Sequence, residues 1–317
     1  MPKQKILIDC DPGHDDAVAI LFAAKHMELV GVTTVHGNNT LENTTRNGLA
    51  VLELGGVDVP LAAGCSEPLA QVSVGVAPMH GKGGLDGADI PLPVRRPVSA
   101  HAVDFIIAMA EKHRGELILA TIGPETNIAM AIKREPRLRQ WVREITVIGG
   151  STTTGNYTPA AEFNIAGDVE AAWTVFESCI PIRMAGLNIT RRTGFDQGDI
   201  DRMRASGRRV AGVIADLMQF YLGRQQVGYG LNIAPMHDVC AIVPYVDDSL
   251  LQFLHTSVRI ELTGTHTRGM TVCDVRHPKG SAEPSLRNRS DPNALLAVEV
   301  RSRALIDRVI DTILDYA

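Results

Sequence analysis

Short apolar runs alternate with longer amphipathic segments along the first two thirds of the chain. The short runs are rich in Val and Ile and have the length of buried strands; they lie at 5–10, 29–35, 116–123, 144–150 and 181–187. The longer segments repeat apolar residues at helical spacing and lie at 13–26, 41–56, 127–136 and 168–178. This alternation predicts an α/β fold with a doubly wound, mostly parallel sheet and helices on both faces, of the Rossmann-like type.

The later part of the chain is less regular. Its pattern predicts helices around 209–226, from His237 onward and near 303–316, with strands near 257–262 and 269–275.

Two further stretches, 65–97 and 228–235, are expected to be loops. The first is long and rich in Gly and Pro, which is typical of an active-site lid and equally of an ordinary surface loop. The βαβ pattern passes the midpoint of the chain without a break in composition, and no repeat is present. We therefore expect residues 1–317 to form a single domain.

Composition narrows the classes of function. The chain has 317 residues, 45% of them hydrophobic, a net charge of −5 and few aromatic residues, which argues against nucleic acid as a partner. Its five cysteines are scattered without a CxxC pair, as in proteins with reduced and mostly buried thiols. No apolar run approaches the length of a membrane span and no signal region precedes the first strand. We expect a soluble, cytoplasmic protein with no membrane partner.

Four aspartates follow the first apolar run within a few residues of one another: Asp9, Asp11, Asp15 and Asp16. No Lys or Arg lies between Lys5 and Lys25 to offset their charge, so a bound hard cation with oxygen ligands is the economical interpretation. A metal at the carboxyl end of a strand can activate water, which predicts a hydrolase. The structural alternative is a helix capped by Asp11 with Pro12 at its first position, which explains Asp11 and one further carboxylate but not four.

Other polar side chains follow predicted strands or helix starts. Asn38 follows the run at 29–35, the loop after 144–150 carries Asn156, Glu162 and Asn164, and His237 stands beside Asp238. Taken alone, Asn38 is typical of a turn and His237-Asp238 of a structural hydrogen bond. Ligands of open parallel sheets bind outside the carboxyl ends of the strands, so we expect these residues to meet. Amides and carboxylates together suit a polyol, because vicinal hydroxyls both donate and accept hydrogen bonds.

Several motifs, in this order, resemble the inosine-uridine preferring nucleoside hydrolase family. They are DCDPGHDDAVAI, VHGNNTLENTTRNG, MHGKGGLDG, IGPETNIAMAI, GNYTPAAEFNIAGDVEAA, APMHDV and GMTVCD. The resemblance covers nearly the whole chain from Lys5 to the GMTVCD strand. It implies the nucleoside hydrolase fold, one bound Ca²⁺, hydrolysis of ribonucleosides to ribose and free base, and a homodimer or homotetramer.

The resemblance also implies a role for each matching residue. Asp11, Asp16 and Asp238 would bind calcium through their side chains and Ile122 through its backbone carbonyl, with a water and two ribose hydroxyls completing the shell. Asp11 would also be the general base that deprotonates the water. His237 would protonate or polarise the departing base.

The remaining implied residues bind substrate. Asp15 would hold the ribose diol, Asn38 the water and the sugar, and His80 would close over the site as part of a lid. The other implied contacts to sugar or base are Ile148, Asn156, Glu162, Phe163, Asn164, Tyr221, Gln225 and Tyr229. Cleavage of an N-ribosyl bond passes through an oxocarbenium-like sugar, which a pocket of carboxylates and amide oxygens stabilises.

The sequence leaves the base preference open. Gln225 resembles the pyrimidine-preferring subgroup, whereas an aromatic residue at Tyr221 resembles members that also accept purines. Asn188 stands where the family often has Asp, and Lys82 where it often has Glu.

Two other functions are weighed against this one. Asp9 and Asp11 fit the DxD start of a haloacid-dehalogenase-type phosphatase, but Gly13 stands where that family has Thr or Val. A non-catalytic nucleoside-binding homologue would be expected to have lost Asp11 or His237, and both are present.

Overall fold

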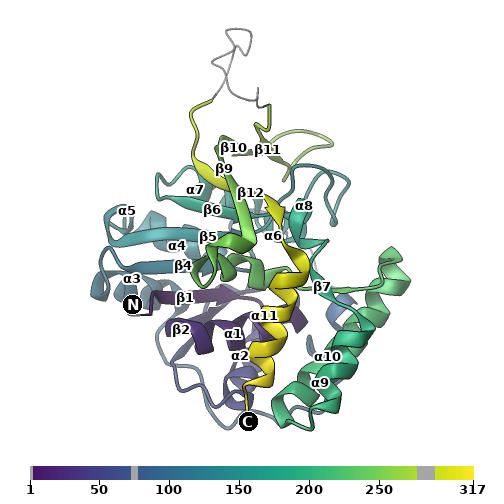
Figure 1. Cartoon of the computed structure of the whole chain (residues 1–317). Helices are drawn as coiled ribbons and strands as arrows, with labels where there is room; N and C mark the ends of the chain where they lie inside the picture. Colours follow the sequence, from purple (N-terminus) through teal and green to yellow (C-terminus); the bar gives the residue numbers. More distant parts are fainter. Residues whose placement is uncertain (1–2, 73–77, 277–289) are drawn as a thin grey trace.

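An eight-stranded sheet forms the centre of the computed structural model, which describes residues 3–72, 78–276 and 290–317 (Figure 1). Neighbouring strands are parallel, except that the two strands at one edge of the sheet pair antiparallel. The order across the sheet is β3 (Leu61–Ala63), β2 (Glu28–Thr34), β1 (Lys5–Cys10), β4 (Leu117–Thr121), β5 (Val142–Ile148), β6 (Ile182–Ala185), β12 (Ala294–Val300) and β9 (Leu251–Thr256). The predicted doubly wound, mostly parallel sheet is confirmed.

Both faces of the sheet are covered by helices, as a buried parallel sheet requires. Side chains alternate along β1, so that Ile6 and Ile8 enter one apolar core and Leu7 enters the other. The first core is completed by α1 (His14–His26), α2 (Leu41–Leu54), α10 (Arg209–Tyr229) and α11 (Ser302–Leu314). The second is completed by α3 (Ala102–Lys112), α4 (Thr126–Arg134) and α7 (Val169–Phe176).

The start of α1 excludes the alternative of a helix capped by Asp11. Gly13, not Asp11, is the residue before the helix, and its N–H donates to the Asp16 carboxylate at 2.8 Å. The Asp11 carboxylate instead accepts the backbone N–H of Asn38 at 2.6 Å. Asp11 is therefore turned toward the neighbouring strand connection, while Asp15 and Asp16 lie in the first turn as predicted.

The later half holds most of the other differences. The helix predicted from His237 is wrong: the chain forms short 3-10 turns, η2 (Asp238–Ala241) and η3 (Val243–Tyr245), the second of which contains Pro244. The two predicted strands form a separate antiparallel pair, β10 (Val258–Ile260) and β11 (Thr271–Cys273). Strands β9 and β12, and helices α3 and α9 (Gln197–Ala205), have no counterpart in the prediction.

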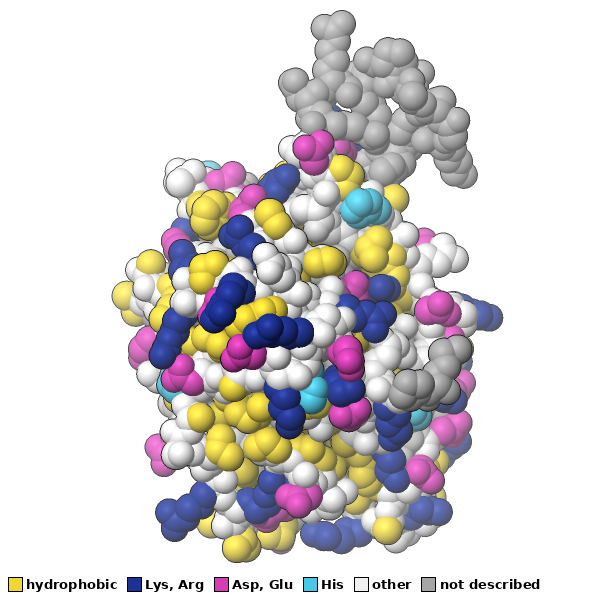
Figure 2. Space-filling view, turned by 90° about the vertical axis from the view of Figure 1, so that its left-hand side faces the viewer, with side chains coloured by type: hydrophobic (Ala, Val, Ile, Leu, Met, Phe, Trp, Pro, Cys, Tyr) yellow, Lys and Arg dark blue, Asp and Glu magenta, His cyan; other side chains and the backbone are white. Residues whose placement is uncertain are grey.

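The five cysteines are all free, but only Cys10 and Cys240 are buried, so the expectation of mostly buried thiols is wrong. Within the described ranges, no helix is both long and apolar enough to cross a membrane. On the face shown in Figure 2, Lys and Arg side chains are interspersed with Asp and Glu side chains. Cytoplasmic location and the homo-oligomer stay predictions.

The strand order places a crevice between β1 and β4. From β1 the chain moves through α1 to β2 on one side, whereas β4 and its successors extend to the other side. Adjacent loops therefore leave in opposite directions where Asp9 pairs with Thr121, at the carboxyl ends of the two strands. Such a switch point is where open α/β sheets bind ligands.

Candidate active site

A cluster of buried carboxylates lies at this switch point. Asp15 and Asp16 come from the first turn of α1 and Asp238 from the start of η2, and carboxylate oxygens of the three lie within 4.8 Å of one another. Asp11 leaves β1 beside them and is fully buried. Among the described residues, no Lys, Arg or His forms an ion pair with any of the four.

The electrostatics of the cluster favour a bound cation. Burial raises the pKa of each of the four carboxyl groups, and the charge of Asp16 raises the pKa values of Asp11, Asp15 and Asp238 further. Oδ1 of Asp11 and Oδ1 of Asp16 are buried without a hydrogen-bond partner. Unpartnered carboxylate oxygens at this spacing fit a hard, oxygen-liganded metal ion.

Asn38 holds the other oxygens of Asp11 and Asp16. Its backbone N–H donates to Oδ2 of Asp11 at 2.6 Å, and its side-chain Nδ2 donates to the Asp11 carbonyl at 3.1 Å and to Oδ2 of Asp16 at 3.3 Å. The preceding Gly37 has φ +152°, and a Cβ on it would lie 2.0 Å from Oδ2 of Asp11. The β2–α2 turn thus needs glycine to bring Asn38 onto the cluster.

Asn164 fixes the backbone carbonyl of Ile122. Its Nδ2 donates to that carbonyl at 3.1 Å and to the carbonyl of Ile148 at 2.9 Å. Glu162 caps α6 (Phe163–Gly167): its Oε2 accepts the N–H groups of Asn164 at 2.9 Å and Gly150 at 3.0 Å. These bonds make the loop after β5 a rigid wall above the cluster.

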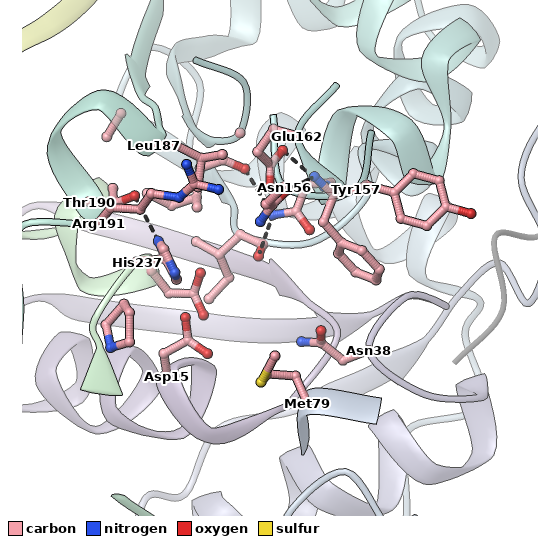
Figure 3. A pocket seen from close by; sticks show the side chains of 18 of the residues that line it. Asp15, Asn38, Met79, Asn156, Tyr157, Glu162, Leu187, Thr190, Arg191 and His237 are labelled. Carbon is pink, nitrogen blue, oxygen red and sulfur yellow. Dashed lines mark hydrogen bonds between the residues drawn. The ribbon is translucent and has the colours of Figure 1, made fainter. Parts of the chain in front are cut away.

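A cavity of about 490 Å³ opens over the carboxylates (Figure 3). Of the residues predicted from the sequence, only Asp11 and Asp16 do not line it, and both are fully buried. The prediction missed several lining residues: Met79, Tyr157, Leu187, Thr190, Arg191 and Leu231. Three of these, Leu187 to Arg191, follow the carboxyl end of β6, so the strand-end rule could have found them.

Two histidines line the cavity away from the wall built by Glu162. Nδ1 of His237 lies 2.7 Å from the hydroxyl oxygen of Thr190, a bond drawn in Figure 3. Burial, aided by the charge of Arg191, lowers the pKa of His237 to about 4, so the ring is neutral near pH 7. Nδ1 of His80 lies 2.9 Å from Nδ1 of His14, which itself contacts the carbonyl of Asp86. His14, which was not among the predicted site residues, thereby holds His80, the predicted lid residue.

Two of the three polar residues left uncertain by the sequence have structural partners. Asp9 accepts hydrogen bonds from Thr33 at 2.6 Å and Asn127 at 2.8 Å, so it ties β1 to β2 and α4. Asn188 donates to the carbonyl of Ala297 in β12 at 2.9 Å. Lys82 is exposed and lies outside the residues that line the cavity.

Comparisons with known proteins agree with this geometry. The family model described as "Inosine-uridine preferring nucleoside hydrolase" matches residues 6–307. The pyrimidine-specific ribonucleoside hydrolase RihB of Escherichia coli (strain K12) is 40% identical over 276 residues, which cover 86% of this chain and 88% of that protein. The pyrimidine-specific ribonucleoside hydrolase RihA of Escherichia coli O9:H4 (strain HS) is 36% identical over 316 residues, or 98% and 99% of the two chains.

Solved structures give the same result. A plant nucleoside hydrolase, PpNRh1, matches with a TM-score of 0.90 and 30% identity over 99% of this chain and 100% of that chain. A purine-preferring ribonucleoside hydrolase from Gardnerella vaginalis matches with a TM-score of 0.89 and 30% identity over 98% of both chains. The haloacid-dehalogenase alternative is therefore wrong, and the chain is a ribonucleoside hydrolase that belongs to the inosine-uridine preferring nucleoside hydrolase family.

Proposed function

We propose that this enzyme cleaves the N-glycosidic bond of ribonucleosides with the help of one bound Ca²⁺, and that pyrimidine ribonucleosides are its preferred substrates. The observation that carries the proposal is the buried, unpaired carboxylate cluster beneath a nucleoside-sized cavity. Asp11, Asp16 and Asp238, with the carbonyl of Ile122, would hold the ion, because calcium prefers carboxylate and carbonyl oxygens. When bound, the ion would supply the positive charge that orients the ribose diol and acidifies water.

Asp11 is the general base in this proposal. Asn38 binds its Oδ2 and leaves Oδ1 without a partner, so Oδ1 can accept a proton from the attacking water. Asp15, which lines the cavity, would accept a hydrogen bond from the ribose diol. A 2′-deoxyribonucleoside lacks one of these hydroxyls and should therefore be a poor substrate.

The wall of the cavity would hold the rest of the sugar. The Asn156 Oδ1 accepts the N–H of Phe163 at 2.8 Å, which fixes the amide so that its NH₂ group can donate to a ribose hydroxyl. Glu162 and Asn164 would add oxygen atoms near the ring. Positive charge that develops on the sugar would be stabilised by these oxygens and by Asp15.

Residues on the other side of the cavity would receive the base. A neutral His237 ring would polarise the leaving base by donating a hydrogen bond. His80, Tyr221, Gln225 and Tyr229 would surround the base, together with Ile148 of β5 and Phe163 of α6. A preference for pyrimidines is supported by Gln225, whose amide both donates and accepts, and by the two relatives named pyrimidine-specific.

A panel of nucleosides tests the proposal. The purified protein is incubated with uridine, cytidine, inosine, adenosine, guanosine and their 2′-deoxy forms, and released ribose is measured as reducing sugar. We expect uridine and cytidine to be cleaved fastest and every 2′-deoxy form to lose most of the activity. Faster cleavage of purine ribonucleosides would refute the stated preference, and absence of cleavage across the panel would support the non-catalytic alternative.

A further inference from the structure

Thr190 makes the only side-chain hydrogen bond that holds the His237 ring among the described residues. It ends α8 (Leu187–Thr190), which follows β6, and its side chain is almost fully buried while lining the cavity. Its hydroxyl oxygen lies 2.7 Å from Nδ1 of His237 (Figure 3). Arg191 anchors this end of α8, because its guanidinium donates to the carbonyl of Gly155 at 3.0 Å.

The direction of the hydrogen bond decides which ring nitrogen carries the proton. Within the described part of the chain, Nδ1 of His237 is the only hydrogen-bond partner of the Thr190 hydroxyl. If the hydroxyl accepted from Nδ1, its own proton would be left without a partner in a buried position, which costs free energy. Donation from Thr190 to Nδ1 avoids this cost. An Nδ1 that accepts a hydrogen bond carries no proton, so the ring proton is on Nε2.

We propose that Thr190 is a positioning residue for the hydrolysis: it fixes the tautomer and the orientation of His237 so that Nε2–H points at the departing base. The inference rests on the proposed role of His237 at the leaving group. No proton is transferred in this step. Nε2–H stays on His237 and donates a hydrogen bond while negative charge builds on the base. Removing the hydroxyl should therefore slow only those substrates whose base needs that hydrogen bond.

Substitutions at two threonines of the same chain segment test the inference. Thr190→Val removes the hydroxyl at nearly constant volume, and Thr190→Ser keeps it. Thr193→Val is the matched control, because Thr193 is also buried and its hydroxyl donates to the carbonyl of Ile189 at 3.3 Å, away from His237. Steady-state kcat and KM are measured on uridine and on p-nitrophenyl riboside, whose leaving group departs without help.

We expect Thr190→Val to lower kcat on uridine roughly tenfold, the value of one hydrogen bond, with KM nearly unchanged. Its kcat on p-nitrophenyl riboside should fall less than about threefold on the same reasoning. Thr190→Ser and Thr193→Val should retain wild-type kcat on both substrates. Equal losses of Thr190→Val on the two substrates, or no rescue by serine, would overturn the inference.

A double-mutant cycle separates this inference from the proposed function. In a His237→Ala background, Thr190→Val should cost nothing further on uridine, because the partner of the hydroxyl is gone. An undiminished cost in that background would refute action through His237. If His237→Ala itself leaves uridine hydrolysis unchanged, the proposed leaving-group role fails, and the inference that depends on it fails with it.

The ring proton can also be observed directly. Ring ¹⁵N chemical shifts of His237, assigned by difference from the His237→Ala variant, should show a protonated Nε2 and an unprotonated Nδ1. In Thr190→Val the two tautomers should become mixed. A wild-type ring protonated at Nδ1 would contradict the proposed direction of the bond.

Discussion

At the scale of single residues, burial changes the chemistry of carboxylates both inside and outside the candidate site. Glu125 precedes α4 and is fully buried, yet neither of its carboxylate oxygens has a hydrogen-bond partner. Burial, with a contribution from the charges of Glu162 and Asp168, raises its pKa well above the ordinary value. Sequence patterns did not single out Glu125, because its position reads as an ordinary residue before a helix and its burial arises only from the tertiary fold.

Glu125 should make the folded protein less stable as pH rises. A carboxyl group whose pKa is raised by folding contributes its full stabilisation below the unfolded pKa, and this is lost as pH rises through the folded pKa. Glu125→Gln should therefore gain stability relative to wild type as pH rises above the ordinary pKa of a glutamate. Urea unfolding in saturating calcium measures this difference, and Glu42→Gln, an exposed change in α2, serves as control. A difference that stays constant with pH would contradict the raised pKa.

Asp11 is proposed to serve both as the general base and as a metal ligand. Asp11→Asn keeps an oxygen that can accept the Asn38 N–H but removes the basic oxygen, so kcat on uridine should fall more than about a thousandfold. Calcium affinity, measured by titration calorimetry, should fall as well, because one ligand charge is lost. Asp9→Asn, at the end of the same strand but bonded to Thr33 and Asn127, should retain most activity. Substantial activity in Asp11→Asn would exclude Asp11 as the base.

At the scale of elements, the regular first half of the sheet could be predicted and the connections could not. The helices α1, α2, α4 and α7 appear close to their predicted bounds. In α2, α4 and α7 apolar residues repeat at helical spacing and bury one face, whereas α1 is buried on all sides from His14 to Ala23. The helix expected from His237 failed because the chain turns sharply through Val243–Tyr245, with Pro244 inside the turn. Thr190 and His14 were missed since their partners, His237 and His80, lie far away in sequence.

The β2–α2 turn carries an element-scale prediction. Gly37→Ala would place a methyl group where Oδ2 of Asp11 lies, so Asp11 or the turn must move. Because misplacing a catalytic group by about 1 Å can cost about a hundredfold in rate, we expect at least that loss in kcat/KM on uridine. Gly56→Ala is the control: its φ of +60° is also positive, but no atom lies within 4 Å of the added methyl group. Equal effects of the two changes on activity would show that backbone strain, not the contact with Asp11, is responsible.

At the scale of the whole molecule, both apolar cores share one sheet. The last helix, α11, packs in the same core as α1, and the hydroxyl of Tyr316 donates to the carbonyl of Leu21 at 2.7 Å. The two ends of the chain are thus joined by direct contacts. We infer from this that residues 1–317 fold as a single domain, and that events at the carboxylate cluster affect the stability of the whole chain.

Removal of the metal is the global test of that coupling. The cluster joins α1 to η2, so an ion that binds only the folded protein should stabilise the entire domain. At a hundredfold excess over Kd the gain is about 2.7 kcal/mol, which corresponds to roughly 4 °C in Tm for a domain of this length. EGTA should therefore lower Tm and abolish uridine hydrolysis, and added Ca²⁺ should restore both.

The identity of the ion follows from the same measurement. Mg²⁺ demands a small octahedral shell and gives up its water reluctantly, so it should restore Tm and activity poorly compared with Ca²⁺. The variant Asp16→Asn, which loses one of the clustered carboxylates, should show little response to either ion. If EGTA changes neither Tm nor activity, and elemental analysis of the active protein finds no divalent metal, protons neutralise the carboxylates instead. Full restoration by Mg²⁺ would instead reassign the ion.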